Sequence, residues 1–313
     1  MISTAFISEG TGGKSPNIFS TFGTSELKSW MADLDIPALA DRIFETMRRT
    51  FLILILLTAC PAQKLRFSPV EKAIILARAG DIPSSGPERL ARMKELFLES
   101  GCLTVTEQGM PSSETPNLIC RLNGGGEGTI IVGANYGQVS PDNWAGASLL
   151  PSLYQSLAAR KRRHTFIFVA FADERKTSTG AQFFAAHMTD AEVKHSQAMI
   201  DLDALGLSPT KFWAAHSDKS LVKALVVVMY ALKLPASQVN IAKAGEADSE
   251  AFASRHIPQI TLHSLTREAV AVMHNQQDPA QKFRPNNYYD SYHLISGYLA
   301  YLDETLKSRP TIK

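Results

Sequence analysis

The 313-residue sequence lacks the features that mark several common protein classes. Its three cysteines have no CxxC spacing, which excludes a disulfide-rich scaffold and a zinc ribbon. None of its purely apolar runs is longer than nine residues, whereas a bilayer-spanning helix needs about 20, so a multi-pass membrane protein is excluded. Lys and Arg total 32 against 30 Asp and Glu, and this near-neutral balance gives no reason to expect a nucleic-acid partner.

Familiar catalytic motifs are also missing. The sequence contains no GxSxG elbow, no HExxH pair and no GxGxxG loop. What remains is an ordinary globular composition, with 45% hydrophobic and 20% charged residues. A chain of this length can bury a large core.

The apolar run at residues 51–57 (FLILILL) has the length of a signal-peptide core. Arg48 and Arg49 precede it, and the following residues 57–60 (LTAC) resemble a bacterial lipobox, in which the cysteine is acylated. We therefore expect residues 1–46 to lie upstream of the true start or to be disordered, and residues 47–59 to be a signal peptide. Residues 60–313 would then form one domain, exported to the bacterial cell envelope or periplasm and attached to lipid through Cys60. The alternative is a genuine N-terminal extension in which the run forms a buried strand or helix.

Export would place Cys102 and Cys120 in an oxidising compartment, where they could pair across a strand hairpin. The alternative is two free buried thiols.

Hydrophobic periodicity and turn residues predict alternating strands and helices after residue 68. Near-continuous apolar strands suit a sheet that is covered on both faces. We therefore expect a three-layer α/β/α fold with a mostly parallel central sheet. The predicted strands are 103–108, 117–122, 129–134, 165–172, 199–203, 211–215 and 259–262, and the predicted helices are 68–79, 87–100, 144–159, 180–187, 220–232, 249–255 and 289–306.

Polar residues gather where predicted strands end. Asn135 and Asp142 follow one strand, 173–174 (DE) follow the next, Asp201 and Asp203 close a third, and His274 comes later. Sites in open α/β sheets form beyond the carboxyl ends of strands. Carboxylates with a histidine in such a place suggest metal-assisted hydrolysis.

At these residues the chain resembles metallopeptidase family 28, the dizinc exopeptidases that include bacterial aminopeptidases and the related glutaminyl cyclases. The resemblance rests on residues 130–136 (IIVGANY), 142–146 (DNWAG), 168–174 (FVAFADE), 199–203 (MIDLD) and His274. It implies the three-layer fold, zinc as the cofactor if any is bound, and peptides with a free N-terminus as ligands.

The resemblance also implies roles for individual residues. Asp142 matches the aspartate that bridges two metals, Asp203 matches a ligand of one metal, and His274 matches a ligand of the other. Glu174 matches the general base.

Three positions depart from the family pattern. Asn135 replaces the first histidine ligand, Gly137 replaces the aspartate that orients it, and Arg175 replaces a glutamate ligand. Arginine has no acceptor and keeps its positive charge. A one-residue shift that makes Asp173 the base and Glu174 the ligand is possible but needs a gap.

These departures favour an inactive or very weakly active homologue that binds a peptide or another partner in the inherited cleft, with the Arg175 guanidinium among the carboxylates. The alternative is an active one-metal peptide hydrolase that uses Asp142, Asp203 and His274, with Glu174 as base. A third possibility is an envelope protein that uses a different surface. We expect no nucleic-acid partner, and membrane contact only through a lipid at Cys60.

Overall fold

The computed structural model describes residues 65–111, 113–137, 141–172, 179–239, 247–266 and 283–307, with residues 141–143 described by their backbone alone. The strands are β1 (Val105–Gln108), β2 (Asn117–Leu122), β3 (Thr129–Asn135), β4 (Thr165–Phe171), β5 (Ser196–Asp203), β6 (Lys211–Phe212), β7 (Ser237–Gln238) and β8 (Gln259–His263). The helices are α3 (Lys72–Gly80), α4 (Gly86–Glu99), α5 (Pro141–Ala158), α6 (Thr179–Ala186), α7 (Asp190–His195), α8 (Lys219–Leu232), α9 (Glu250–Ala253) and α11 (Pro285–Thr305), with a short 3-10 turn η1 (Ala214–His216).

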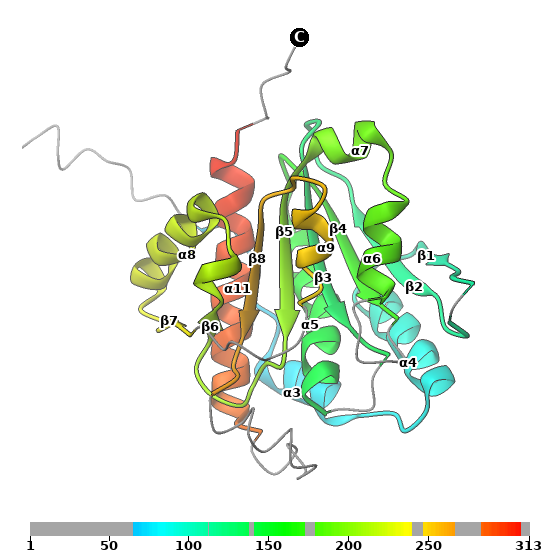
Figure 1. Ribbon diagram of the computed structural model, residues 1–313. Helices are drawn as coiled ribbons and strands as arrows, with labels where there is room; N and C mark the ends of the chain where they lie inside the picture. The colour runs from blue at the N-terminus through cyan, green and yellow to red at the C-terminus, as the bar shows by residue number, and fades with distance from the viewer. Residues whose placement is uncertain are drawn as a thin grey trace, which may run out of the picture. The chain divides into compact units, whose positions relative to one another are not determined.

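In this part of the chain the strands form one eight-stranded mixed sheet in the order β1-β2-β4-β3-β5-β8-β6-β7 (Figure 1). The central strands β4, β3, β5 and β8 are parallel to one another, whereas β2 and β6 run antiparallel to their central neighbours. Their parallel register brings the carboxyl ends of β3, β4, β5 and β8 to one edge of the sheet. This edge is where the polar residues were expected to meet.

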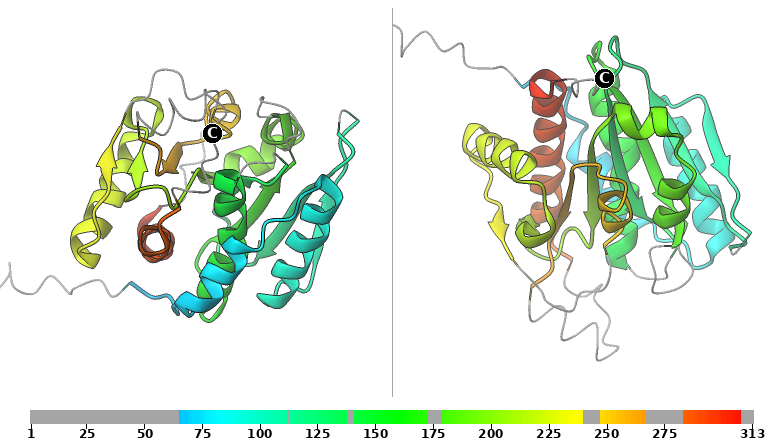
Figure 2. Two further views of the ribbon diagram at one scale, coloured as in Figure 1. Left: turned by 90° about the horizontal axis from the view of Figure 1, so that it is seen from below. Right: turned by 45° about the horizontal axis from the view of Figure 1, so that its top comes forward.

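Helices cover both faces of the sheet, as the two turned views show (Figure 2). One core lies under α3, α4, α5, α8 and α11 and includes Phe97, Leu153 and Tyr298. The other core lies under α6 and α9 and includes Phe184 and Phe252. The predicted three-layer α/β/α fold is therefore confirmed, and its central strands are buried on both faces as their apolar sequences require.

Several predicted bounds differ from the structure by two to four residues, and two of these differences have a clear cause. The first helix begins at Lys72 and not at Ser68, because the segment before it is docked in an extended form. There the Ser68 amide donates to the Ser156 carbonyl (3.0 Å), and the Val70 amide donates to the Tyr292 hydroxyl (2.7 Å). The strand predicted over 211–215 ends at Phe212 and continues as η1.

The short helix α7 and the edge strand β7 were not predicted. Thr189 caps α7 in a capping box with Glu192, so local hydrogen bonds define a helix too short for a periodic signal.

Residues Lys64–Lys313 form one compact unit. Within the described ranges, no helix has both the length and the apolar character needed to cross a bilayer. The predicted signal peptide and Cys60 lie outside the described residues, so the targeting of the chain stays a prediction.

A disulfide joins Cys102, which follows α4, to Cys120 in β2. Their Cα atoms are 6.3 Å apart, and both residues are buried. The bond fastens the end of α4 to the sheet at the register position where Val105 of β1 pairs with Cys120. Of the two possibilities for these cysteines, the structure has the paired one.

We expect the Cys102→Ser/Cys120→Ser double variant to unfold more easily than the wild type. The bond spans 18 residues of sequence, and removing a closed loop of this size costs about 3 kcal/mol in a chain-entropy estimate. Urea denaturation of both proteins checks this, with Leu103→Ser, a change at the exposed residue next to Cys102, as the matched control that should keep wild-type stability. Equal stability of the double variant and the wild type would show that the bond contributes nothing.

Candidate functional site

The carboxyl edge of the sheet presents polar side chains on the face that α6 and α9 cover. Asn135 is the last residue of β3, and Asp203 is the last residue of β5. His263 ends β8 and is the register partner of Asp203. Asp201 lies one register step earlier, beside Gly133 and Thr261. Parallel pairing therefore brings these groups together although they are far apart in sequence.

Asn135 uses its side chain to shape the turn that follows β3. Its Oδ1 atom accepts a hydrogen bond from the Gly137 amide at 3.0 Å. This is an Asx turn, in which the side chain takes the place of a backbone carbonyl. One of the two lone pairs on the oxygen that could serve as a ligand is thus used by the local backbone.

A buried arginine holds the same turn from outside the sheet. Arg89 of α4 is 3% exposed, and its Nε donates to the Tyr136 carbonyl (2.9 Å) while its Nη2 donates to the Gly137 carbonyl (2.7 Å). Tyr136 is itself fixed, because its amide donates to the Phe171 carbonyl (2.9 Å) and its hydroxyl donates to the Pro116 carbonyl (2.6 Å). Charge-assisted bonds of this kind are stronger than neutral ones. The turn is therefore rigidly placed at the edge of the sheet.

Asn117 ties down the two ends of the segment that joins β4 to α6. This fully buried side chain accepts a hydrogen bond from the Ala172 amide and donates one to the Gly180 carbonyl, each at 2.9 Å. The predicted base Glu174 and the substituted position Arg175 belong to the residues between them. The Asn117 side chain therefore fixes the backbone before and after the segment that contains Glu174 and Arg175.

The end of β5 places two carboxyl groups, Asp201 and Asp203, near each other. Burial, together with the nearby Asp203 carboxylate, raises the pKa of Asp201 to about 8. Hydrogen bonds offset part of this effect, because the Thr261 hydroxyl donates to Asp201 Oδ2 at 3.1 Å and the Ser249 and Leu202 amides also donate to this carboxylate. Such a pair of carboxylates favours a cation beside it.

His263 is a neutral histidine beside this charge. Burial, followed by the positive charge of Lys211, lowers its pKa to about 4. Its Nδ1 atom accepts a hydrogen bond from the Leu265 amide at 3.1 Å. Lys211, the register partner of His263 on β6, donates from Nζ to the Ser208 hydroxyl and to the Pro209 carbonyl.

The structure therefore brings Asn135 and Asp203 to one edge, as expected. Asp142 lies in the first turn of α5, but its side chain is not described. Glu174, Arg175 and His274 lie outside the described residues, and their roles stay predictions. Among the side chains that the structure does describe, no three of His, Cys, Asp and Glu are grouped as a metal site would need.

Sequence reasoning missed Arg89, Asn117 and His263. His263 directly follows a predicted strand, so its position at a strand end was a usable signal. Arg89 and Asn117 act through backbone carbonyls and amides of distant segments, and no local pattern reveals such contacts.

The sequence of this chain matches a known protein family. The model of Peptidase family M28 matches residues 117–299. No curated protein matches the chain.

Several solved structures have a similar fold. The zinc aminopeptidase BSAP from Bacillus subtilis is 17% identical with a TM-score of 0.54, and the match covers 62% of this chain and 52% of BSAP. The LapA aminopeptidase of Legionella pneumophila is 13% identical with a TM-score of 0.62, covering 75% of this chain and 71% of LapA. A glutaminyl cyclase from Fimbriiglobus ruber is 16% identical with a TM-score of 0.61, covering 78% of this chain and 99% of the cyclase. The chain thus spans about half the length of BSAP and nearly all of the cyclase.

The low pKa of His263 predicts an acid-sensitive fold. Between pH about 6.5 and 4 the unfolded chain binds a proton that the folded chain excludes at this histidine, so the free energy of unfolding falls as the pH drops through this window. The loss of stability from this histidine would be about 3 kcal/mol at most.

In His263→Asn, which keeps an acceptor for the Leu265 amide, this part of the pH dependence should disappear. Urea denaturation across the window measures it, with the exposed histidine variant His187→Asn as the control. If the free energy of unfolding of His263→Asn depends on pH as strongly as that of the wild type, His263 is not buried in its neutral form.

Proposed function

Because the chain belongs to peptidase family M28, we propose that it binds the free N-terminal end of a peptide, or a peptide-like ligand, at the carboxyl edge of its sheet and hydrolyses it very weakly or not at all. The position where the family carries its first histidine ligand supports this proposal best. Here that position holds Asn135, whose oxygen accepts the Gly137 amide.

The residues of this chain do not fit a pair of zinc ions. Zinc prefers imidazole, thiolate and carboxylate ligands, and an amide oxygen is a weak substitute. Gly137 also lacks the carboxylate that would orient a ligand histidine. The loss of both groups affects the same metal position.

Arg175 makes the other position unfavourable. The family resemblance would put its guanidinium where the family has a glutamate ligand. A unit charge about 4 Å from a divalent ion is repelled by about 8 kcal/mol at an effective dielectric constant of about 20. The guanidinium would instead pair with the carboxyl groups at the end of β5, where burial of Asp201 next to Asp203 makes a second unpaired negative charge unfavourable.

The same pair of carboxyl groups favours a second candidate function, because a bound cation would stabilise both of them in the ionised form. A single metal ion held by Asp142, Asp203 and His274 would also neutralise this end of β5, and it would supply an activated water. Glu174 would then serve as the general base, and the chain would be a one-metal peptide hydrolase.

We also propose that the chain is exported, through a signal peptide at residues 47–59, and anchored by a lipid on Cys60. The disulfide between Cys102 and Cys120 supports export, because such bonds persist in oxidising compartments. The ligand would then be a peptide of the cell envelope or periplasm.

Metal content and activity test the proposed function directly. After incubation with zinc and desalting, the wild type should hold fewer than about 0.1 zinc ions per chain, because a strong site is absent. The Asn135→His/Arg175→Glu variant restores two ligands and should gain about one zinc ion per chain. It should also hydrolyse leucine p-nitroanilide at least about tenfold faster than the wild type. Mass spectrometry and a colorimetric assay measure both.

Adding Asp142→Ala to the restored variant is the control, and it should remove both gains, because Asp142 matches the aspartate that both metal positions share. A wild type that retains about one metal ion per chain, lost in His274→Ala, would replace the proposal with the one-metal hydrolase.

A further inference from the structure

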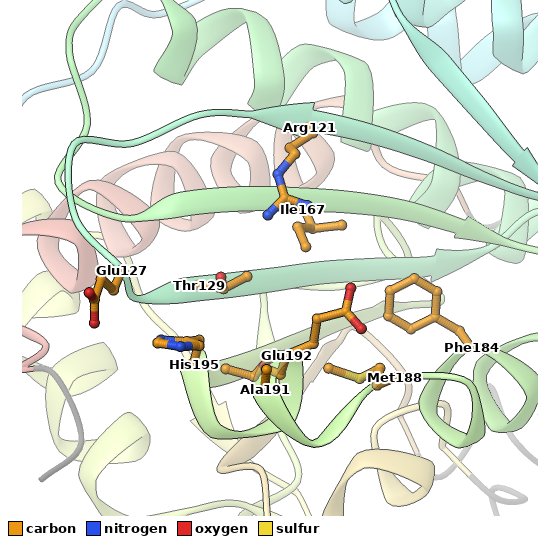
Figure 3. A pocket seen from close by; sticks show the side chains of 10 residues that line it. Arg121, Glu127, Thr129, Ile167, Phe184, Met188, Ala191, Glu192 and His195 are labelled. Carbon is orange, nitrogen blue, oxygen red and sulfur yellow. Dashed lines mark hydrogen bonds between the residues drawn. The ribbon is translucent and has the colours of Figure 1, made fainter. Parts of the chain in front are cut away.

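A pocket of about 190 Å³ opens at the amino ends of the central strands, away from the candidate site (Figure 3). Thr129, the first residue of β3, and Ser196, the first residue of β5, line it. Asn135 ends β3 six residues later, which corresponds to about 20 Å of extended chain. The pocket and the carboxyl edge are therefore separate sites.

One wall of the pocket is apolar. Ile167 of β4 forms the floor, and Phe184 of α6 and Met188 stand opposite it (Figure 3). All three side chains are less than 10% exposed, so this wall is preformed. An apolar group of a ligand would lose contact with water here at little cost in side-chain order.

The remaining wall carries opposite charges. Arg121 of β2 is the register partner of Ile167, and its guanidinium lies over that side chain (Figure 3). Among the described residues this guanidinium makes no hydrogen bond and no ion pair. Its planar fork suits a carboxylate.

Glu192 of α7 extends its carboxylate into the same space (Figure 3). One oxygen, Oε2, accepts hydrogen bonds from the Thr189 amide and hydroxyl, both at 2.8 Å. These bonds fix the side chain at the helix start, and the other oxygen remains available to accept from a ligand.

We propose that this pocket binds a free α-amino acid with an apolar side chain. Its carboxylate would pair with Arg121, its ammonium group with Glu192, and its side chain would pack on Ile167, Phe184 and Met188. A simple anion would face the carboxylates of Glu192 and Glu127, and a simple cation would face Arg121. A zwitterion matches both charges, and a pocket of this volume suits an amino acid of about the size of leucine or phenylalanine.

This binding site is independent of the proposed function, because no residue of the carboxyl edge contributes to it. It would let the chain respond to free amino acids, the product class of exopeptidase action, whether or not the chain hydrolyses peptides itself.

Isothermal titration calorimetry of the full chain with L-leucine and L-phenylalanine tests the proposal. Saturable binding is expected, and Arg121→Gln should weaken it at least about tenfold by removing a charge-assisted pair. Arg160→Gln, at an exposed arginine outside the pocket, is the matched control and should bind as the wild type does. Ala191→Trp, on the exposed side of α7, should fill the pocket and abolish binding.

Ligand analogues test the same contacts without altering the protein. L-Leucinamide lacks the carboxylate and 4-methylpentanoate lacks the ammonium group, so each should bind at least about tenfold more weakly than L-leucine. Absence of saturable binding up to the solubility limit of both amino acids would overturn the proposal. So would binding that is unchanged in Arg121→Gln and Ala191→Trp, since the amino acid would then occupy another site.

Discussion

The close approach of α5 to β5 is the contact on which the carboxyl edge depends. A Cβ atom at Gly146 would lie 2.5 Å from the Leu202 carbonyl oxygen, so only glycine permits the helix to approach the strand at this distance. Gly146 stands one helical turn after Asp142, and Leu202 directly precedes Asp203. The backbone contact therefore fixes the start of α5 against the end of β5, independently of what binds there.

Around this contact, the fold keeps the edge in place by means that do not involve a metal ion. Arg89 holds the turn after β3 through two carbonyls, and Asn117 holds Ala172 and Gly180. When a site loses its metal ion, the carboxylates that held the ion repel each other and destabilise the site. In this chain the supporting bonds are made to the backbone, so ligand positions could change while the scaffold remained.

The sequence predicted the fold well because buried parallel strands have a strong pattern. The apolar runs of β3 and β4 and the helical spacing in α4 set their positions to within a few residues. Strand ends then indicated where Asn135 and Asp203 would meet.

The positions of short elements and of single buried contacts could not be predicted in this way. The extended segment at Ser68 follows from hydrogen bonds to α5 and α11, and α7 follows from a local capping box. The neutral state of His263 depends on its burial and on the positive charge of Lys211, which belongs to a different strand. Such features arise from tertiary contacts, whereas periodicity reports only which face of an element is buried.

The hydrogen bonds of Asn117 to Ala172 and Gly180 fix the backbone on both sides of the segment between β4 and α6. Asn117 belongs to the neighbouring strand β2 and holds the two ends close together. The free energy of closing a loop between such ends grows only slowly with loop length. A change of chain length between these two fixed points would therefore cost little free energy of loop closure, much as recognition loops differ in length on a common antibody framework. This sheet edge could therefore serve as a scaffold for grafted loops. The sequence between Ala172 and Gly180 would determine ligand specificity, and the sheet and its helices would provide the stability.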